Sequence, residues 1–430
     1  MNERRINPFC PNGAIAPGMF AGRFEEIKAI ETSLIQAKGG NPVNLLITGE
    51  RGIGKTSLLQ YAEVVAEGHL SVESVSFKFL ISSVSLTSRM TRKTLIKLIE
   101  REVARKLSTT EKARSFIQNT WSFVKRIEVS GTKISTAEQE QEDELMLDDF
   151  AWAILQTAKR ITADEQDTFS AAYDGIVILV DEADNAPAAI GLGEFLKTVQ
   201  EKLQKGGVRS VFFILAGLPN VRDVLKDSHE SSLRLFEDHA LGRLEADEVE
   251  YVIKRCLDSS FEKCGRKTTI DDEAKAELVR LADGYPHFIQ QFGYSAFNAD
   301  EDGHIDMSDV IRGAFGNGGA LELIGSRYYS DDFFNKIKSD SYRSVLRVMA
   351  EDMDSWVSRQ NIKRKFDGAD TTLTNALKVL SDRGIIERDQ TRQGYYRLKQ
   401  KGFAWWILLL ADKQEQKRRA TKKRPQLVNP

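Results

Sequence analysis

Cysteine is scarce in this chain of 430 residues, which has only Cys10, Cys256 and Cys264. Their spacing matches neither a disulfide framework nor a zinc site, and this fits a protein of the reducing cytosol. Long apolar runs are lacking as well, because the longest one near the C-terminus, Trp405 to Ala411, is far too short to span a bilayer. The N-terminus is polar and has no signal-peptide pattern. These absences predict a soluble, cytoplasmic protein with no membrane partner.

An excess of one charge is also absent, because 61 Lys and Arg residues nearly balance 63 Asp and Glu residues. The formal net charge of −2 excludes a bulk attraction to nucleic acid, so any such contact needs a local basic face. We find neither an internal repeat nor a second catalytic motif. The length exceeds what one hydrophobic core serves and predicts two or three domains.

The strongest pattern present is G-E-R-G-I-G-K-T, residues 49–56, which fills every fixed position of the phosphate-binding loop G-x-x-x-x-G-K-[ST]. The apolar run 43–48 predicts a buried strand before the loop, and 57–67 predicts a helix after it. The glycines let successive backbone N–H groups point at phosphate oxygens, and the helix start adds its positive dipole end. Lys55 can reach the β and γ phosphates, and Thr56 offers a hydroxyl ligand to Mg²⁺. The predicted nucleotide-binding residues here are Gly49, Glu50, Arg51, Gly52, Ile53, Gly54, Lys55, Thr56 and Ser57.

A second constellation follows the aliphatic run 175–180, which is typical of a strand covered on both faces. Asp181 can hold Mg²⁺, directly or through water, and Glu182 can orient and deprotonate the attacking water. A solvated acidic turn is the alternative reading, and Asp184 is available for that turn too. Both carboxylates are needed for hydrolysis, so the pair favours an ATPase that uses ATP and Mg²⁺ over a protein that only binds nucleotide.

Strands alternating with helices predict a parallel α/β sheet in the first half of the chain. The expected strands are 43–48, 77–84, 175–180 and 211–216, and the expected helices are 57–67, 91–107, 145–161 and 192–203. A polar insertion covers about 108–143 and contains a possible hairpin at 127–134. Beyond about residue 244 the strand pattern stops, and the expected helices are 246–257, 271–282 and 286–299.

A different module begins near residue 342. Helices over 342–351, 359–366 and 371–383, then strands over 385–388 and 395–399, predict a winged helix-turn-helix. Its third helix has a buried stripe of Leu373, Leu377 and Leu380 and an opposite face of Thr372, Thr374, Asn375 and Lys378; Arg388, Arg392 and Lys399 lie on or beside the wing. This face suits DNA, but winged helices also dock on proteins and the cations are few. The basic tail 413–430 can bind phosphates or merely keep the chain in solution.

The expected domains are therefore an α/β nucleotide-binding domain at 1–244, a helical lid and linker at 245–335, a winged helix at 336–412 and the tail at 413–430.

Over residues 7–298 the chain resembles the AAA+ ATPases, and more narrowly their origin-recognition-like and STAND-related branches. The residues that carry the resemblance are F-A-G-R-F-E-E at 20–26, the phosphate-binding loop, the pair Asp181-Glu182, A-G-L-P-N at 216–220 and G-Y-P-H at 284–287. The resemblance implies a P-loop NTPase sheet with a helical lid.

Roles carried over from the family apply residue by residue. Arg23 belongs to the box that packs beside the adenine. Asn220 matches the sensor 1 segment, although an Asn after Pro219 also forms turns. Arg234 lies where relatives place an arginine finger that acts on a neighbouring subunit. Arg243 competes with it, and an ordinary surface arginine is the alternative for both.

Pro286 belongs to the lid motif, and His287 stands where many members have a sensor 2 arginine. An imidazole there could report the phosphate only weakly, and a core or capping histidine is the alternative. Lid closure of the standard kind is therefore in doubt.

Two functions remain open. The first is an ATPase that assembles as a homo-oligomer on DNA, which the winged helix and tail would grip. The second is a STAND-like signalling or defence switch that acts through partner proteins without DNA. A non-enzymatic module that uses ATP only to set its shape is a third idea, which the intact Asp181-Glu182 pair disfavours.

Overall fold

The computed structural model describes residues 5–13, 20, 22–72, 74–125, 136–163, 169, 172–337, 339–353, 355–411 and 413, with side chains described from 141 onward in the stretch 136–163. The expected hairpin at 127–134, and the tail beyond residue 413, lie outside this set. The chain forms two compact units, one of residues 14–242 and one that combines 1–13 with 243–430.

The unit of residues 14–242 is built on a five-stranded sheet in the order β2-β3-β4-β1-β5, whose paired strands all run parallel. The strands are β1 (Asn44–Gly49), β2 (Phe79–Ser85), β3 (Gly175–Asp181), β4 (Val211–Gly217) and β5 (Phe236–Leu241). The central strands β1 and β4 are buried along their whole length, and β1 buries the polar residues Asn44 and Thr48 beside its apolar ones. The predicted parallel α/β sheet is confirmed.

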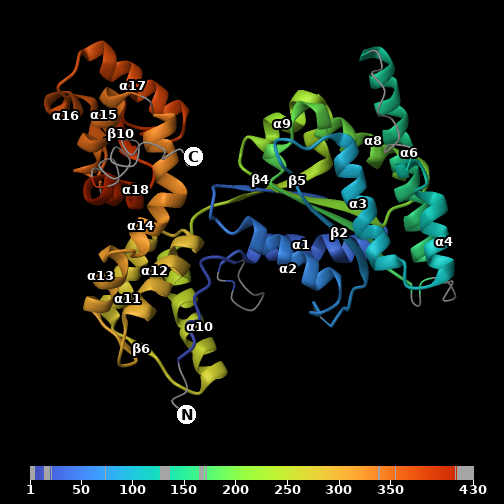
Figure 1. The fold of residues 1–430 in the computed structure, drawn as a ribbon, viewed down its shortest axis with the longest axis horizontal. Coiled ribbons are helices and arrows are strands. Elements are labelled where there is room, and N and C mark those ends of the chain that lie inside the picture. Colours follow the sequence, from blue (N-terminus) through green and yellow to red (C-terminus); the bar gives the residue numbers. More distant parts are fainter. Residues whose placement is uncertain are drawn as a thin grey trace, which may run out of the picture. The chain divides into compact units, whose positions relative to one another are not determined.

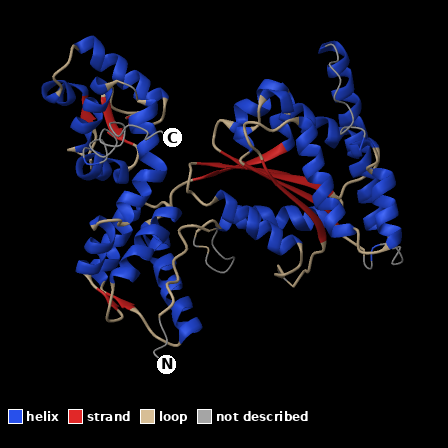
Figure 2. Ribbon diagram, in the orientation of Figure 1, coloured by secondary structure: helices blue, strands red, loops and turns tan. Residues whose placement is uncertain are grey.

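Helices cover both faces of this sheet (Figures 1 and 2). One face carries α1 (Phe24–Lys38) and α2 (Lys55–Ala66); the other carries α3 (Arg92–Leu107), α4 (Glu111–Thr120), α6 (Thr136–Thr162), α8 (Leu192–Lys205) and α9 (Val221–Ser228). Alternate strand residues such as Leu46 and Ile178 point to the second face and share a core with Phe150 and Phe195. These two phenyl rings lie 5.1 Å apart between centroids.

Two expectations for this unit need correction. Strand β5 was not expected, because F-E-D-H-A-L carries charges and buries only Leu241. It lies at the edge of the sheet, beside β1 alone, so its exposed positions tolerate polar residues. The insertion expected at 108–143 is largely helical where it is described, since α4 lies within it and α6 begins at Thr136, well before the expected residue 145.

The second unit contains helices over the range expected for the lid. They are α10 (Ala246–Cys264), α11 (Asp272–Ala282), α12 (Pro286–Ala299), α13 (Met307–Phe315) and α14 (Ala320–Ile324), followed by the short π-helical segments η5 (Gly325–Tyr329) and η6 (Asp332–Lys336). The N-terminal segment packs on these helices: Asn7 Nδ2 donates to the Tyr294 carbonyl over 2.9 Å, and Arg5 pairs with Asp300. The strand pattern does not stop at 244, because β6 (Thr269–Ile270) and β7 (His304–Ile305) form a small parallel pair.

The end of the chain contains the elements expected of a winged helix. They are α15 (Asp340–Ala350), β8 (Val357–Ser358), α16 (Arg359–Lys365), α17 (Asp370–Asp382), β9 (Ile386–Arg388) and β10 (Tyr395–Leu398), then α18 (Lys401–Trp406) and the π-helical segment η7 (Ile407–Ala411). The strands form an antiparallel sheet in the order β8-β10-β9, of which β8 was not expected. Leu373, Leu377 and Leu380 are buried, as predicted. Among the described residues, no helix combines the length and apolarity needed to cross a membrane.

Candidate nucleotide-binding site

The phosphate-binding loop connects β1 to α2, and its glycines meet distinct steric demands. Gly52 and Gly54 have φ of 79° and 103°, in the region that side chains with a Cβ rarely adopt. At Gly49 a Cβ would lie 2.8 Å from the Ile53 Cγ2 atom. The loop therefore turns tightly into the first residue of α2, Lys55, where helix N–H groups and the dipole favour an anion.

Lys55 lies folded back over this loop. Its Nζ donates to the Gly49 and Glu50 carbonyl oxygens, each over 2.9 Å. Burial lowers the pKa of the ammonium group, and the carboxylates of Asp184, Asp181 and Glu182 act in the opposite direction. Lys55 is thus surrounded by acceptors, and phosphate oxygens of the same polarity can replace the two carbonyls.

The residues predicted to hold Mg²⁺ lie together. Thr56 Oγ1, in the first turn of α2, donates to Asp181 Oδ2, at the end of β3, over 2.8 Å. A hydroxyl and a carboxylate are oxygen ligands of the kind that Mg²⁺ prefers, and Mg²⁺ usually completes its shell with phosphate oxygens and water. No cluster of three or more His, Cys, Asp or Glu able to hold a metal occurs in the described part of the chain. The pair fits a magnesium ion that is shared with a triphosphate.

Glu182 follows directly and is exposed. Its backbone has a φ of 54°, in the left-handed region, where a non-glycine residue is uncommon. Asn185 Nδ2 donates to Glu182 Oε2 over 3.0 Å. The proposed base is therefore presented on a sharp turn at the strand end and is held by a neighbour. The sequence analysis did not identify Asn185 as a site residue. Its place three residues after Glu182, at the end of the short segment η2 (Ala183–Asn185), was the available signal.

Asn220 lies at the N-cap of α9, exposed, and its side chain forms no hydrogen bond with a described residue. The loop 218–220, which carries Asn220, is fixed at its start because the Leu218 N–H donates to Asp184 Oδ1 over 2.8 Å. Asp184 was read as a possible member of a solvated turn. In the structure its carboxylate joins the end of β3 to the end of β4.

Arg23 connects the N-terminal box to the phosphate-binding loop. It adopts a left-handed conformation, with φ of 62°, just before α1. Its Nη2 donates to the Ile53 carbonyl over 3.3 Å and to the Gly242 carbonyl over 2.6 Å. Arg23 therefore stabilises the phosphate-binding loop through hydrogen bonds to backbone carbonyl oxygens.

The two candidate arginine fingers differ in their surroundings. Arg234 lies in the turn η4 (Glu230–Leu235), is exposed, and pairs with no described residue. Arg243 belongs to the other unit, where its guanidinium pairs with Asp283 at 3.0 Å, donates to the Lys399 carbonyl and lies 4.8 Å from the centre of the Tyr285 ring. Arg234 is thus the freer of the two side chains.

Pro286 and His287 start helix α12 in the second unit, so their role at the nucleotide stays a prediction. Burial, together with the charge of Arg327, lowers the pKa of His287 to about 4, which makes the imidazole neutral at neutral pH. Its ring packs against Tyr328, 5.2 Å away between centroids. These contacts are those of a packed histidine, the alternative that the sequence left open.

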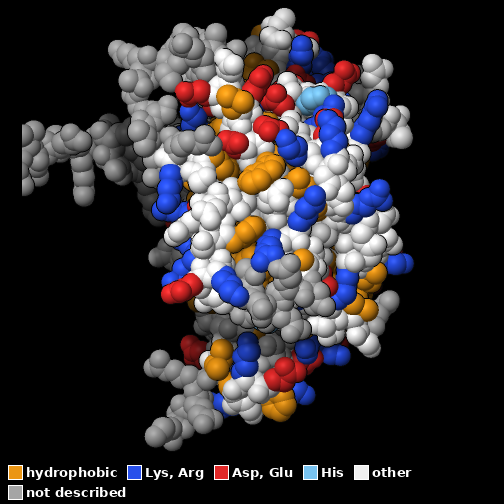
Figure 3. Space-filling view, turned by 90° about the vertical axis from the view of Figure 1, so that its right-hand side faces the viewer, with side chains coloured by type: hydrophobic (Ala, Val, Ile, Leu, Met, Phe, Trp, Pro, Cys, Tyr) orange, Lys and Arg blue, Asp and Glu red, His pale blue; other side chains and the backbone are white. Residues whose placement is uncertain are grey.

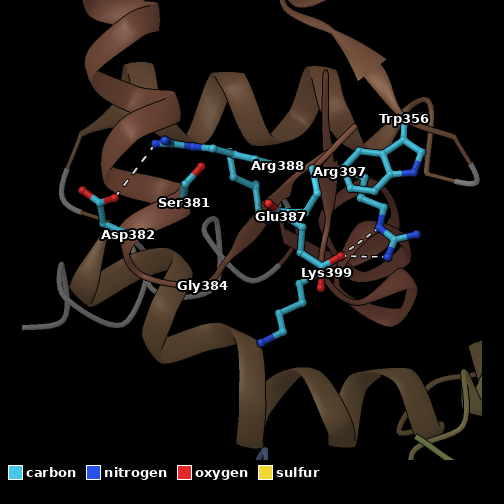
Figure 4. A pocket seen from close by; sticks show the side chains of 10 residues that line it. Trp356, Ser381, Asp382, Gly384, Glu387, Arg388, Arg397 and Lys399 are labelled. Carbon is cyan, nitrogen blue, oxygen red and sulfur yellow. Dashed lines mark hydrogen bonds and ion pairs between the residues drawn. The ribbon is translucent and has the colours of Figure 1, made fainter. Parts of the chain in front are cut away.

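The C-terminal module has an open pocket of about 750 Å³ beside its small sheet (Figure 4). Arg397 pairs with Glu387 at 2.8 Å and lies 4.5 Å from the centre of the Trp356 ring. Arg388 faces Asp382 at 4.0 Å, and Arg392 pairs with Asp389 at 2.6 Å. The arginines expected to meet phosphates on the wing are therefore already paired with acids.

Comparisons with known proteins agree with this fold. Residues 19–214 match the protein family described as AAA ATPase domain. The ORC2 protein of Aeropyrum pernix, solved in ADPNP–ADP complexes, is similar at 14% identity and a TM-score of 0.55, covering 97% of this chain and 99% of that one. The ADP form of that protein aligns at 16% identity and a TM-score of 0.46, covering 95% and 97%. The ORC1 protein of the same organism in complex with DNA aligns at 16% and 0.42, covering 93% and 94%.

A comparison with curated protein sequences finds no match. Sequence identity this low supports a shared fold and nothing finer, whereas the family match covers the loop, Asp181 and Glu182. Residues 19–214 are thus similar to the AAA ATPase domain family, and the chain shares its fold with the ORC2 protein of Aeropyrum pernix.

Proposed function

We propose that this protein hydrolyses ATP with Mg²⁺ at the phosphate-binding loop and couples its nucleotide state to assembly on DNA or with partner proteins. The observation that carries the proposal is the 2.8 Å contact between Thr56 and Asp181, with Glu182 next in the chain. A metal ligand pair and a candidate base thereby meet at the carboxyl end of β3, next to the loop that would cradle the phosphates. Nucleotide sites of open α/β sheets form at this end of the strands.

Each residue has a distinct task in this reaction. Backbone N–H groups of the loop and Lys55 bind the β and γ phosphates, and Thr56 and Asp181 would hold Mg²⁺, which neutralises charge on the phosphate oxygens. Glu182 orients a water molecule in line with the γ phosphorus and accepts its proton as the new P–O bond forms, while the bond from the γ phosphorus to the β–γ bridging oxygen breaks and ADP leaves. Asn220 lies on the neighbouring loop, from which it can donate to the γ phosphate or the water. An arginine such as Arg234, supplied by a second copy, would stabilise the charge of the transition state.

Two substitutions test the site. Lys55→Ala should abolish binding of a fluorescent ATP analogue, because the phosphates lose their only lysine in the loop. Glu182→Gln should bind the analogue normally but lower phosphate release by about a hundredfold or more, since the amide cannot accept a proton. Phosphate release at the wild-type rate in Glu182→Gln would remove this residue from the role of base.

The DNA part of the proposal rests on the C-terminal module. Helix α17 exposes Asn375 and Lys378, and no ion pair between Lys378 and another described residue is formed. Figure 3 shows another part of the surface, on the side of the α/β unit, where basic side chains are interspersed with acidic and apolar ones. The charge distribution of the C-terminal module, with exposed Lys378 and paired arginines on the wing, predicts modest, salt-sensitive DNA affinity. It equally favours the alternative, a STAND-like switch that acts through partner proteins.

A titration of duplex DNA with the full chain and an ATP analogue separates the two functions. If α17 contacts DNA, Lys378→Ala should weaken binding and reduce the slope of log K against log salt by about one unit. Lys275→Ala is the matched control, because that lysine pairs with Asp272 on the lid helix α11. Binding weaker than micromolar, with no acceleration of ATP hydrolysis by DNA, would leave the partner-protein function.

A further inference from the structure

We propose that Asp184 and Arg222 are positioning residues for hydrolysis, which together clamp the Asn220 loop to the two main motifs of the site. This inference rests on the proposed ATPase function. The structural basis is that the loop 218–220 is tied on one side to the segment after Glu182 and on the other to the strand that enters the phosphate-binding loop.

The first tie comes from Asp184, in the turn η2 after β3. Its Oδ1 accepts the Leu218 N–H over 2.8 Å, directly after the last residue of β4. The space between them is tight, because a Cβ on Gly217 would lie 3.0 Å from the same Oδ1 atom. The start of the Asn220 loop is thus fixed relative to Asp181 and Glu182 by one charge-assisted bond.

The second tie comes from Arg222, in the first turn of α9. Its Nη2 donates to Thr48 Oγ1 over 2.9 Å, and its Nε and Nη2 donate to the two Asp238 carboxylate oxygens over 2.6 and 2.9 Å. Thr48 is buried and directly precedes Gly49, the first residue of the phosphate-binding loop. Asp238 lies on the edge strand β5. One guanidinium therefore joins α9 to both β1 and β5.

Asn220 lies between these ties, two residues from each anchored position. Helix α9 has only eight residues, and no side chain caps its N-terminus, so its first turn has little local support. The bidentate geometry to Asp238, with the third bond to Thr48, requires the planar fork of arginine and cannot be reproduced by lysine. The clamp thus supplies the support that the helix lacks, and it relates Asn220 to both neighbouring motifs.

The consequence for chemistry is positional. A displacement of about 1 Å of a group that contacts the reacting atoms can lower a rate by about a hundredfold. Arg222 and Asp238 have no assigned contact with nucleotide, so loosening the clamp should slow turnover without weakening ATP binding. Asp184 lies nearer to Lys55, whose pKa its carboxylate tends to raise, so Arg222 gives the cleaner test.

The test compares Arg222→Gln, Arg222→Lys and Asp238→Asn with the control Arg209→Gln, which changes an exposed arginine just before β4. We expect Arg222→Gln to lower kcat about 10- to 100-fold, with the dissociation constant of a fluorescent ATP analogue within about twofold of wild type. Arg222→Lys should behave like Arg222→Gln, and Arg209→Gln like wild type. Asp184→Asn, which keeps an oxygen acceptor for Leu218, should retain more activity than Asp184→Ala.

The decisive measurement is a double-mutant cycle with Asn220→Ala. If Arg222 acts through Asn220, Arg222→Gln should cause no further loss of kcat in the Asn220→Ala background. Independent, additive losses, or wild-type kcat in either single variant, would overturn the inference.

Amide hydrogen exchange of residues 218–224 provides a readout that does not need hydrolysis, and it also identifies a variant that simply fails to fold. Arg222→Gln should raise exchange in this segment alone, while exchange in α2 and β3 stays at the wild-type level. If the wild-type protein shows no turnover, the proposed ATPase function fails, whereas unchanged exchange at 218–224 refutes the clamp itself.

Discussion

At the scale of single residues, burial lowers the pKa of two basic groups whose neighbouring charges act in opposite directions. Burial lowers the pKa of both Lys55 and His287. Around Lys55, three carboxylates oppose the effect and favour the cation that a triphosphate needs. Around His287 the charge of Arg327 lowers the pKa further, so the imidazole stays neutral. A neutral ring cannot reproduce the charge of a sensor arginine.

The low pKa of His287 predicts a pH-dependent stability. The folded protein binds this proton only near pH 4, whereas the unfolded chain binds it near pH 6.5, so the fold loses stability as the pH falls from about 6.5 to about 4. His287→Leu should remove this loss, which is about 3 kcal/mol at most. Thermal unfolding at several pH values measures it, with the exposed His69→Gln as control. Equal pH slopes in wild type and His287→Leu would contradict the prediction.

Residues close in sequence were predictable, and residues joined only by the fold were not. The phosphate-binding loop and Asp181-Glu182 are contiguous patterns, so the sequence identifies them without a structure. Arg222, Thr48 and Asp238 come from three separate elements, and no local pattern links them. Asp184 and Asn185 could be noticed in the sequence because they directly follow Glu182. Their hydrogen bonds to Leu218 and Glu182 could not be predicted from it.

At the scale of elements, buried strands could be predicted from the sequence and exposed or very short strands could not. Strand β4 is apolar throughout and β1 is apolar over Leu45–Ile47, because helices cover both faces of the sheet, and such runs are readable. Strand β5 escaped prediction because an edge strand needs few buried residues. Strand β8 has only two residues and is defined by its pairing with β10. The early start of α6 was hidden by a polar composition that also suits a loop.

Glycine marks another contact between elements that composition alone does not reveal. A Cβ on Gly193 in α8 would lie 2.2 Å from the Leu225 carbonyl oxygen of α9. The two helices can therefore approach only where this residue has no side chain. Since α9 begins at the Asn220 loop, the packing of α8 contributes to the site from a distance.

At the scale of the whole molecule, the open question is what completes the site. Arg234, in η4 between α9 and β5, is exposed and forms no ion pair with a described residue. A side chain in this state is available to a second copy of the chain. Arg243, by contrast, ties the lid residue Asp283 to the Lys399 carbonyl within its own unit. The two arginines should therefore fail in different ways when they are removed.

Mixing inactive subunits distinguishes action in trans from action within one chain. An Arg234→Ala subunit keeps an intact loop but cannot complete its neighbour, and a Lys55→Ala subunit can complete a neighbour but binds no ATP. Each variant alone should lose turnover, on the order of a thousandfold for Arg234→Ala if it is a finger. In a random equimolar mixture, about a quarter of the sites combine an intact loop with a donated Arg234, and turnover should recover to about that fraction.

Arg243→Ala is the matched control in this experiment. Its loss breaks an ion pair and a backbone contact inside the subunit, so it should lower the unfolding temperature and gain nothing from Lys55→Ala subunits. If turnover recovers in the mixture of Arg234→Ala with Lys55→Ala but not in the mixture of Arg243→Ala with Lys55→Ala, the arginine finger lies in η4 and the active protein is an oligomer. If Arg234→Ala keeps full turnover by itself, it is an ordinary surface residue. If neither mixture recovers, the site is completed within one chain or by a different protein, as a switch that acts through partners requires.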